Sequence, residues 1–497
     1  MGPFQRTTAH EHQRNAPSSS FIVHRFSPPC FRAFVPSCLL LICLLASVAL
    51  AADYPTNRGS SARTGNIDNQ PGPKSPTILW TFASTDHFIA SPVPSDNSIL
   101  ISGLGTFNTA AFYALSTDPA SADRVLWKKS APYLRQPMVC APAVFSGRIF
   151  FGDGMHQTDG ATLHCLQAST GRPLWQFPVP GNLVHLEGSP TLANNRVYIG
   201  GGNAGVLCID PNRVALEGKE MPLDAAQALI DAKWKQLLGQ YEADKKKDPD
   251  FAIPPSEDAL PKPQPIKLWQ VGQDKLHVDS SLAIANNSVL VSSAYLDLEK
   301  VGDRALYCLD ANTGVTQWRT PLQLNPWAGP TVAGNLVLLG SSSIRFDPKD
   351  IPNAKGQLAA FDLTTGQIKW SKDLPGGVIS PVAVADSLAI CTGTDGLVRA
   401  FSLTDGQLKW SYKANAPFFA GPAVSADTLY VADLKAVVHA LSLKTGQKLW
   451  SLDLAAAPTI APGMVYGSPL IHHGRLYLAT CNLETGQQKT VVVCIGQ

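Results

Sequence analysis

Histidine and carboxylate residues recur at equivalent places of a repeated pattern in this chain. The pattern contains a small residue followed by proline, and His87, His185 and His277 each stand five residues before the proline position. A carboxylate follows two of them, in the motifs His185-Leu-Glu187 and His277-Val-Asp279. Imidazole and carboxylate ligands suit several divalent ions, so a metal or small-ligand site is one hypothesis. The alternative, which we adopt as the expectation, is a set of polar residues at a solvated surface that hydrogen-bond to neighbouring loops and hold no metal.

Regularly spaced tryptophans mark the elements that position these residues, and we call them the ladder tryptophans. Eight of the ten tryptophans follow one another at intervals of 47, 48, 94, 49, 52, 40 and 40 residues. Such spacing indicates a repeat architecture, in which each interval is one structural unit. The eight residues are Trp80, Trp127, Trp175, Trp269, Trp318, Trp370, Trp410 and Trp450.

Each repeat unit contains four short strands. A glycine turn precedes five of the tryptophans, as in Thr365-Gly366 before Trp370, and glycine can take the positive φ that such a turn needs. The alternating apolar run 358–362 before this turn is typical of a half-buried strand. Four antiparallel strands in a repeat of about 40 to 45 residues predict the blade of a β-propeller. The predicted fold class is therefore all-β: an eight-bladed β-propeller of four-stranded antiparallel blades.

The two ends of the chain predict how the ring closes. The first strand, around Trp80, carries a tryptophan of the ladder but has no blade before it. The last unit, after Trp450, has three predicted strands and then stops. We expect the N-terminal strand to become the outer strand of the last blade, beside residues 491–495. This pairing would cover an otherwise open strand edge.

Alternate turns of a four-stranded blade lie on opposite faces of the ring. The Thr-Gly turns share one face, and the loops that lead into the inner strands share the other, at the mouth of the central channel. We expect the two histidine motifs to cluster in one sector of that mouth, near Asn325. The candidates for the ligand or partner face are His87, Arg135, His185, Glu187, His277, Asp279 and Trp327. Longer loops on the same face add further candidates, although acidic surface loops are usually only solvated. These candidates are Asp153, His156, Asp159, Asp297, Glu299, Asp303, Arg304, Arg345, Asp347 and Asp350.

An insertion accounts for the 94-residue interval between Trp175 and Trp269. It is predicted to span residues 212–265 and to contain one amphipathic helix at about 224–246, because apolar residues recur there at helical spacing. Asp224 and Gln227 resemble a capping box. We expect the apolar stripe of the helix to pack on the propeller's own surface; a helix that docks a partner is the alternative.

The first 51 residues are predicted to be a signal peptide. The apolar run 39–51 follows Arg25 and Arg32 and ends in the small-residue cleavage pattern Ala49-Leu50-Ala51. An uncleaved signal anchor is the alternative. Residues 52–75 would form an extended segment and residues 76–497 the propeller. The mature chain would then be exported to the periplasm or cell envelope and would have no transmembrane span.

The net charge argues against nucleic-acid binding, and the positions of the cysteines predict their structural role. The chain carries a net charge of only +2, so its composition does not indicate the positively charged surface that nucleic-acid binding needs. Four cysteines after residue 51 take the position that alanine holds in the other units, so they replace a small buried residue. They are Cys165, Cys208, Cys308 and Cys494. We expect free buried thiols, with one or two disulfides as the alternative.

The repeat can be written as Ala/Cys-Leu-Asp-x-x-Thr-Gly-x-x-x-Trp, and it resembles the PQQ-like (pyrroloquinoline-quinone-like) β-propeller repeat family from about Pro76 to Gln497. The resemblance implies that each tryptophan packs between neighbouring blades. The short exported form is similar to outer-membrane assembly factors and quinoprotein-like propellers of bacteria. The insertion after Asp210 and the lack of a lipoprotein site at Cys43 depart from the minimal assembly-factor pattern.

Two function classes follow from this resemblance. The first is a monomeric, non-catalytic scaffold that binds envelope proteins or a small ligand at the channel mouth and needs no cofactor. The second is a PQQ-dependent dehydrogenase, in which the quinone would lie on the channel axis over a calcium ion. Dehydrogenases of this family carry a vicinal cysteine pair, but this sequence has no adjacent cysteines and no matching set of Glu, Asn and Asp ligands. We therefore expect the scaffold and assign no catalytic residue.

Overall fold

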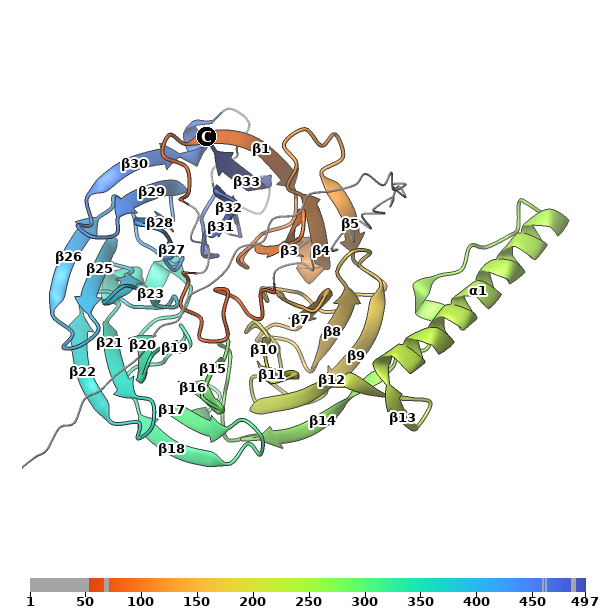
Figure 1. Ribbon diagram of the computed structural model, residues 1–497, viewed down its shortest axis with the longest axis horizontal. Helices are drawn as coiled ribbons and strands as arrows, with labels where there is room; N and C mark the ends of the chain where they lie inside the picture. Colours follow the sequence, from red (N-terminus) through yellow and green to blue (C-terminus); the bar gives the residue numbers. More distant parts are fainter. Residues whose placement is uncertain (1–52, 67–70, 458–459, 461–462, 484–488) are drawn as a thin grey trace, which may run out of the picture. The chain divides into compact units, whose positions relative to one another are not determined.

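Eight antiparallel sheets are arranged around a ring in the computed structural model (Figure 1). The structure describes residues 53–66, 71–457, 460, 463–483 and 489–497. The predicted signal peptide, residues 1–51, lies outside these described residues. Seven sheets have four strands and one has five. The prediction of an eight-bladed β-propeller is confirmed.

The first four blades follow one another in chain order. Blade 1 contains β2 (Val93–Ser95), β3 (Ser98–Leu104), β4 (Ala110–Ser116) and β5 (Val125–Lys129). Blade 2 contains β6 (Ala143–Phe145), β7 (Arg148–Gly152), β8 (Ala161–Gln167) and β9 (Pro173–Val179). Blade 3 contains β10 (Thr191–Ala193), β11 (Arg196–Gly200), β12 (Val206–Leu216), β13 (Lys219–Pro222) and β14 (Gln264–Val271). Blade 4 contains β15 (Ala283–Ala285), β16 (Ser288–Leu296), β17 (Val301–Asp310) and β18 (Thr316–Pro321).

The other four blades complete the ring. Blade 5 contains β19 (Thr331–Ala333), β20 (Leu336–Ser342), β21 (Gly356–Asp362) and β22 (Ile368–Leu374). Blade 6 contains β23 (Ala383–Ala385), β24 (Leu388–Thr392), β25 (Leu397–Ser402) and β26 (Leu408–Lys413). Blade 7 contains β27 (Ala423–Ser425), β28 (Thr428–Ala432), β29 (Val437–Ser442) and β30 (Lys448–Asp453). Blade 8 contains β31 (Leu470–His472), β32 (Arg475–Ala479), β33 (Thr490–Gly496) and β1 (Thr77–Ser84). Short 3-10 helices lie at η1 (Thr106–Asn108), η2 (Glu257–Ala259), η3 (Pro348–Asn353) and η4 (Leu454–Ala456).

A tryptophan on the outer strand of every blade stands opposite an alanine or a cysteine on the neighbouring strand. Directly opposite residues have neighbouring side chains on one face of a sheet, so the small residue leaves room for the indole. The alanine pairs are Ala114–Trp127, Ala360–Trp370, Ala400–Trp410 and Ala440–Trp450. The cysteine pairs are Cys165–Trp175, Cys208–Trp269, Cys308–Trp318 and Cys494–Trp80. All seven cysteines that the structure describes are free and buried, as predicted.

The tryptophans also connect each blade to the next. The indole Nε1 of Trp370 in blade 5 donates a hydrogen bond of 2.9 Å to the carbonyl of Leu403 in blade 6. A Cβ atom at Gly406, in the turn of blade 6, would lie 2.7 Å from the same indole ring. Gly406 has a φ of +67°, so this turn needs glycine both for its backbone conformation and for the close approach. Seven of the eight ladder tryptophans donate such a bond to a backbone carbonyl.

The N-terminal strand closes the ring in the predicted way. Strand β1 pairs antiparallel with β33, and the pairing places Ala83 opposite Val491. Figure 1 shows the two strands side by side at the outer edge of blade 8. The last blade therefore combines three C-terminal strands with one strand from the beginning of the propeller.

Residues 53–66, here called the N-terminal segment, lie across the centre of the ring (Figure 1). The backbone carbonyls of this segment accept hydrogen bonds from the inner strands of blades 2 to 7. The donors are the backbone N–H groups of Val144, Leu192, Ile284, Val332, Val384 and Val424, at 2.8 to 2.9 Å. These bonds satisfy inner-strand groups that would otherwise form open edges. The sequence predicts only an extended conformation for residues 52–75, without these hydrogen bonds.

The insertion in blade 3 contains the single α-helix of the described residues, α1 (Leu223–Lys247). Strand β12 continues past Asn212 to Leu216 before the chain enters β13 and the helix. The predicted capping box is not formed, because the Gln227 side chain donates to the carbonyl of Leu174 at 3.2 Å instead.

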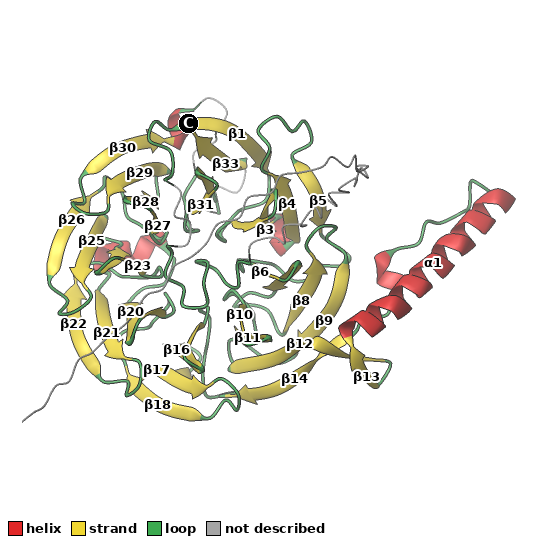
Figure 2. Ribbon diagram, in the orientation of Figure 1, coloured by secondary structure: helices red, strands yellow, loops and turns green. Residues whose placement is uncertain are grey.

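Helix α1 packs on the propeller over its first two turns only. Leu223, Ala226 and Ile230 are its buried residues, whereas Leu238 is 39% exposed, and Figure 2 shows the helix projecting away from the ring. The expected packing of the apolar stripe is therefore confirmed over the first two turns, whereas farther along the helix Trp234 and Leu237 are half-buried and Leu238 is exposed. Among the residues that the structure describes, no helix is both long and apolar enough to cross a membrane.

Candidate binding site at the channel mouth

A cavity of about 370 Å³ lies at the centre of the ring. Its lining residues come from the segments that precede the inner strands of all eight blades, from loops between second and third strands that carry His156 and Arg345, and from Asn57 and Arg63 of the N-terminal segment. We call this cavity the axial pocket. The N-terminal segment forms its floor, and the loops on the predicted mouth face form its rim.

The axial pocket has one apolar wall and one polar wall. The apolar wall is built by Trp327, Phe346, Ile379, Phe419 and Tyr466, from blades 5 to 8. Its rings contact one another edge to face, with centroids 5.7 Å apart for Phe346 and Phe419 and 5.3 Å apart for Phe419 and Tyr466. The polar wall is built by His156, Glu187, Asp279 and Arg345, from blades 2 to 5. A ligand with an apolar part and a polar end would match both walls.

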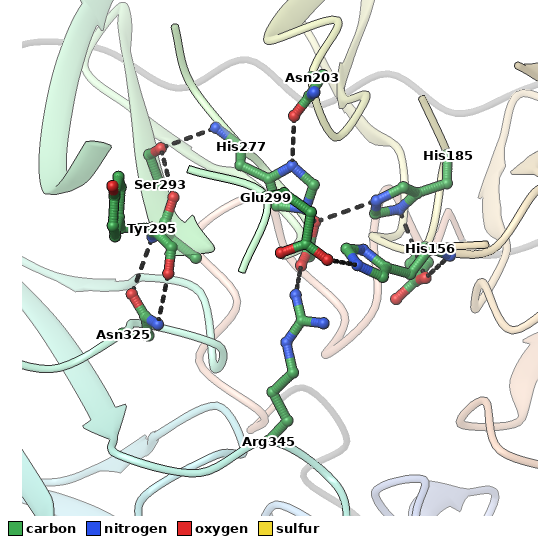
Figure 3. Close-up of polar contacts among 12 residues, drawn as sticks. His156, His185, Asn203, His277, Ser293, Tyr295, Glu299, Asn325 and Arg345 are labelled. Atoms are coloured by element: carbon green, nitrogen blue, oxygen red, sulfur yellow. Dashed lines mark hydrogen bonds and ion pairs between the residues drawn. The ribbon is translucent and has the colours of Figure 1, made fainter. Parts of the chain in front are cut away.

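Three histidines from consecutive blades meet at the polar wall (Figure 3). His156 lies in the loop between β7 and β8, His185 precedes β10, and His277 precedes β15. Their ring centroids are 5.2 to 5.6 Å apart. One nitrogen of each ring lies within 4.8 Å of the corresponding nitrogens of the other two. We call these three residues the histidine cluster.

Two members of the histidine cluster are anchored through one ring nitrogen. The Nδ1 atom of His277 lies 2.6 Å from Oδ1 of Asn203, and Nε2 of His156 lies 3.3 Å from Oε1 of Glu299 (Figure 3). The other ring nitrogens, Nε2 of His277 and Nδ1 of His156, are buried and have no hydrogen-bond partner among the described residues. The same holds for both ring nitrogens of His185, whose side chain is fully buried.

Two carboxylates lie beside the histidine cluster. Oδ1 of Asp279 is 2.8 Å from Nε2 of His277 and 3.6 Å from Nε2 of His185, and Oε1 of Glu187 is 3.4 Å from Nδ1 of His185. None of these contacts has the geometry of a hydrogen bond. The other oxygen of Asp279 lies 3.3 Å from the guanidinium of Arg345.

Burial determines the charge state of this wall. It lowers the pKa of His185 to about 4, so this imidazole is neutral at pH 7. Burial and the neighbouring Asp279 raise the pKa of Glu187 to about 7. Burial alone would raise the pKa of Asp279, but His277, His185 and Arg345 together hold it well below its ordinary value. The wall therefore presents at least one ionised carboxylate beside neutral imidazole.

The structure brings together four of the residues singled out in the sequence, His185, Glu187, His277 and Asp279, and places the others elsewhere. Trp327 lies on the apolar wall, where the Arg345 guanidinium sits 4.3 Å from its ring centroid. Asn325 fixes the backbone of Tyr295 through two hydrogen bonds of 2.9 and 3.0 Å.

Two further predicted residues do not line the axial pocket. Arg135 lines a separate cavity with Tyr133, Asp153 and His164. His87 accepts a hydrogen bond of 3.1 Å from the backbone N–H of Asn482. Both residues are therefore separated from the histidine motifs with which the sequence grouped them.

His156, Glu299 and Arg345 are among the loop candidates of the sequence, but their place beside the histidine motifs could not be predicted, because the repeat register does not show where a long loop folds. No motif or spacing in the sequence identified Arg63 or Asn203 as residues of the site. Arg63 is buried in the floor and donates to the carbonyls of Ser281 and Pro330 at 2.9 and 3.1 Å.

The chain matches a known protein family over two of its parts. The model of a family described as outer membrane protein assembly factor BamB matches residues 108–213 and 302–495, which together are more than half of the chain. No curated protein matches the chain.

Solved structures with the same fold include both assembly factors and enzymes. BamB from Moraxella catarrhalis is 15% identical with a TM-score of 0.55, over 85% of this chain and 98% of that one. The quinohemoprotein alcohol dehydrogenase from Comamonas testosteroni is 13% identical with a TM-score of 0.56, over 90% and 81% of the two chains. A europium-containing methanol dehydrogenase is 14% identical with a TM-score of 0.57, over 90% and 98%. At these identities the likeness shows the fold alone.

Proposed function

The chain belongs to the family described as outer membrane protein assembly factor BamB, and on that premise we propose that it is a non-catalytic binding protein of the cell envelope. Export would depend on the predicted signal peptide, residues 1–51. Its partner would be an envelope protein, or a small ligand, that enters the axial pocket from the mouth face.

The observation that carries this proposal is the construction of the axial pocket. Residues of all eight blades converge on it, and the N-terminal segment forms its floor. A bound segment would therefore enter and leave through the mouth. The aromatic wall offers apolar contact area at the centre of the ring, which is the usual character of a binding hot spot. Phe346, at the rim, is 43% exposed and available to a partner.

The positive charge of Arg63 in the floor of the pocket indicates that the polar end of the ligand is acidic. Arg63 is buried, and it forms no ion pair with any carboxylate that the structure describes. Burial lowers its pKa to about 9, because a guanidinium without a counter-charge is disfavoured away from water. An acidic group on the ligand would compensate this charge. We therefore propose a ligand with an aromatic or aliphatic part next to a carboxylate.

The dehydrogenase alternative fits this site less well. The pocket lies on the ring axis, as a quinone site would, but three histidines meet at its polar wall and the Asn203 side chain beside them is engaged by Nδ1 of His277. All cysteines of the described residues are free, and none is adjacent to another in the sequence. We derive no reaction step through a quinone. Titration of the purified chain with PQQ and calcium, followed by absorbance, should show no uptake if the scaffold proposal is right.

Site-specific photo-crosslinking in intact cell envelopes tests the binding proposal. A crosslinking residue at position 346 would report on the mouth, and one at Ile368, on the outer strand of the same blade and 55% exposed, would be the matched control. We expect a discrete envelope-protein adduct at position 346 only. Trp327→Ala should weaken that adduct severalfold, because it removes part of the apolar wall. Equal labelling at both positions, or none at 346, would contradict the proposal.

A further inference from the structure

We infer that His156, His185 and His277 bind one divalent transition-metal ion, such as Zn²⁺, at the polar wall of the axial pocket. This site goes beyond the proposed envelope-binding function and does not depend on it. It also replaces the expectation from the sequence, which was a set of solvated residues hydrogen-bonded to neighbouring loops without a metal.

The first argument is the state of the ring nitrogens. Buried polar atoms in folded proteins nearly always have a hydrogen-bond partner, and a buried one without a partner needs an explanation. Four such nitrogens gather here, two on His185, one on His277 and one on His156. His185 and His277 are fully buried, so bulk water does not satisfy them. A cation at the centre of the cluster would use three of these four atoms as ligands.

The second argument is the hydrogen bonding behind two of the rings. A metal-binding histidine usually donates its other N–H to a carbonyl or a carboxylate, which fixes the tautomer and the orientation of the ring. Nδ1 of His277 faces the side-chain oxygen of Asn203, and Nε2 of His156 faces the carboxylate of Glu299. Each bond places the proton on the bonded nitrogen, so a lone pair remains on the other nitrogen of the ring.

The third argument is distance. Three nitrogens within 4.8 Å of one another surround a common centre at about 2.8 Å or less, and zinc–nitrogen bonds measure about 2.1 Å. Each nitrogen would therefore need to move inward by about 0.7 Å, which small rotations of the rings supply. The carboxylates of Asp279 and Glu187 already lie 2.8 to 3.6 Å from His277 and His185 without hydrogen-bond geometry.

Asp279 would supply a fourth ligand to the ion and would compensate part of its positive charge. Oδ1 of Asp279 lies beside two of the histidines, while its other oxygen is 3.3 Å from Arg345. A carboxylate is a common ligand of zinc beside imidazole, and such a set favours late first-row ions over magnesium or calcium. His156 is the partly exposed member of the cluster, with 25% of its side chain exposed. The ion would therefore load through the axial pocket.

Zinc titration of the purified, untagged full chain tests this inference. After treatment with a chelator and dialysis, ZnCl₂ alone is titrated in by calorimetry, and the bound metal is counted by elemental analysis. We expect one equivalent at the cluster and a rise in Tm with zinc, because an ion that binds only the folded state stabilises it. Co²⁺ in place of zinc should give the intense visible absorption of a four- or five-coordinate ion.

Variants assign the bound ion to the cluster. His156→Gln and His277→Gln should each weaken zinc binding at least tenfold, and Asn203→Ala should weaken it by about ten- to a hundredfold through the lost support of His277. His439→Gln is the matched control, because His439 is also buried beside a carboxylate, Asp433, but lies outside the cluster. This variant should bind zinc like the parent chain.

Three results would overturn the inference. They are the absence of stoichiometric zinc binding, a Co²⁺ spectrum equal to that of the hydrated ion, and unchanged zinc affinity in both His156→Gln and His277→Gln. The Co²⁺ spectrum needs no variant, so it decides the question even if a substitution prevents folding. Crosslinking at position 346 needs no metal, so the two proposals can fail separately.

Discussion

At the scale of single residues, the pairing of tryptophan with alanine or cysteine accounts for the repeat. The small residue makes room for the indole within one blade, and the glycine turn of the next blade packs on the same ring. Both features could be predicted from the sequence, because they recur at fixed spacing. The histidine cluster could be predicted only in part. His185 and His277 share a register position, whereas His156 reaches them from a loop whose path no periodicity describes.

Replacement of a ladder tryptophan should destabilise the propeller strongly. Trp370 is 7% exposed and spans two blades, so Trp370→Ala should cost about 3 to 5 kcal/mol of unfolding free energy through the cavity it leaves. Urea unfolding measures this loss. Trp234→Ala is the control, because that tryptophan lies on helix α1 outside the ladder. Equal midpoints for the two variants would show that the indole is not a junction residue.

Thiol accessibility tests the role given to the cysteines. Burial raises the pKa of Cys140 and Cys391 to about 12, and the thiolate is the reactive form. At pH 8 the seven buried thiols should therefore not react with Ellman's reagent until the chain is denatured. A disulfide between two of the seven, found in unreduced peptides by mass spectrometry, would contradict this assignment.

At the scale of elements, helix α1 and the N-terminal segment are both additions to the ring of blades, and they differ in how far the sequence predicts them. Helix α1 has a helical apolar pattern and was placed within one residue at each end. The side on which it packs was not predictable beyond two turns, because an apolar stripe does not reveal its partner. The N-terminal segment has no pattern, since it is held through its backbone carbonyls. Any residue can supply a carbonyl, so such contacts leave no trace in the sequence.

Two substitutions on helix α1 separate its docked part from its projecting part. Ile230 is 2% exposed and Leu238 is 39% exposed. Ile230→Ala should lower the unfolding free energy by about 2 to 4 kcal/mol, because a buried aliphatic side chain is lost. Leu238→Ala should change it by less than about 0.5 kcal/mol. Comparable losses in urea unfolding would mean that the helix packs along its whole length.

At the scale of the whole molecule, the first and last strands of the propeller close the ring, and the N-terminal segment forms the floor of the axial pocket. The sequence predicted the closure, because a strand with no blade and a blade with no outer strand complement each other. The floor could not be predicted from the sequence, because the N-terminal segment is held through its backbone carbonyls. The histidine cluster, the aromatic wall and the buried Arg63 all face this one cavity.

A crystal structure of the protein grown with zinc, with anomalous data on both sides of the zinc absorption edge, is the most direct test of the metal site in the axial pocket. We predict one strong anomalous peak between His156, His185 and His277, on the polar wall of a pocket whose floor is the N-terminal segment. A map with no peak among the three histidines, or an N-terminal segment that leaves the channel open at both ends, would contradict this prediction.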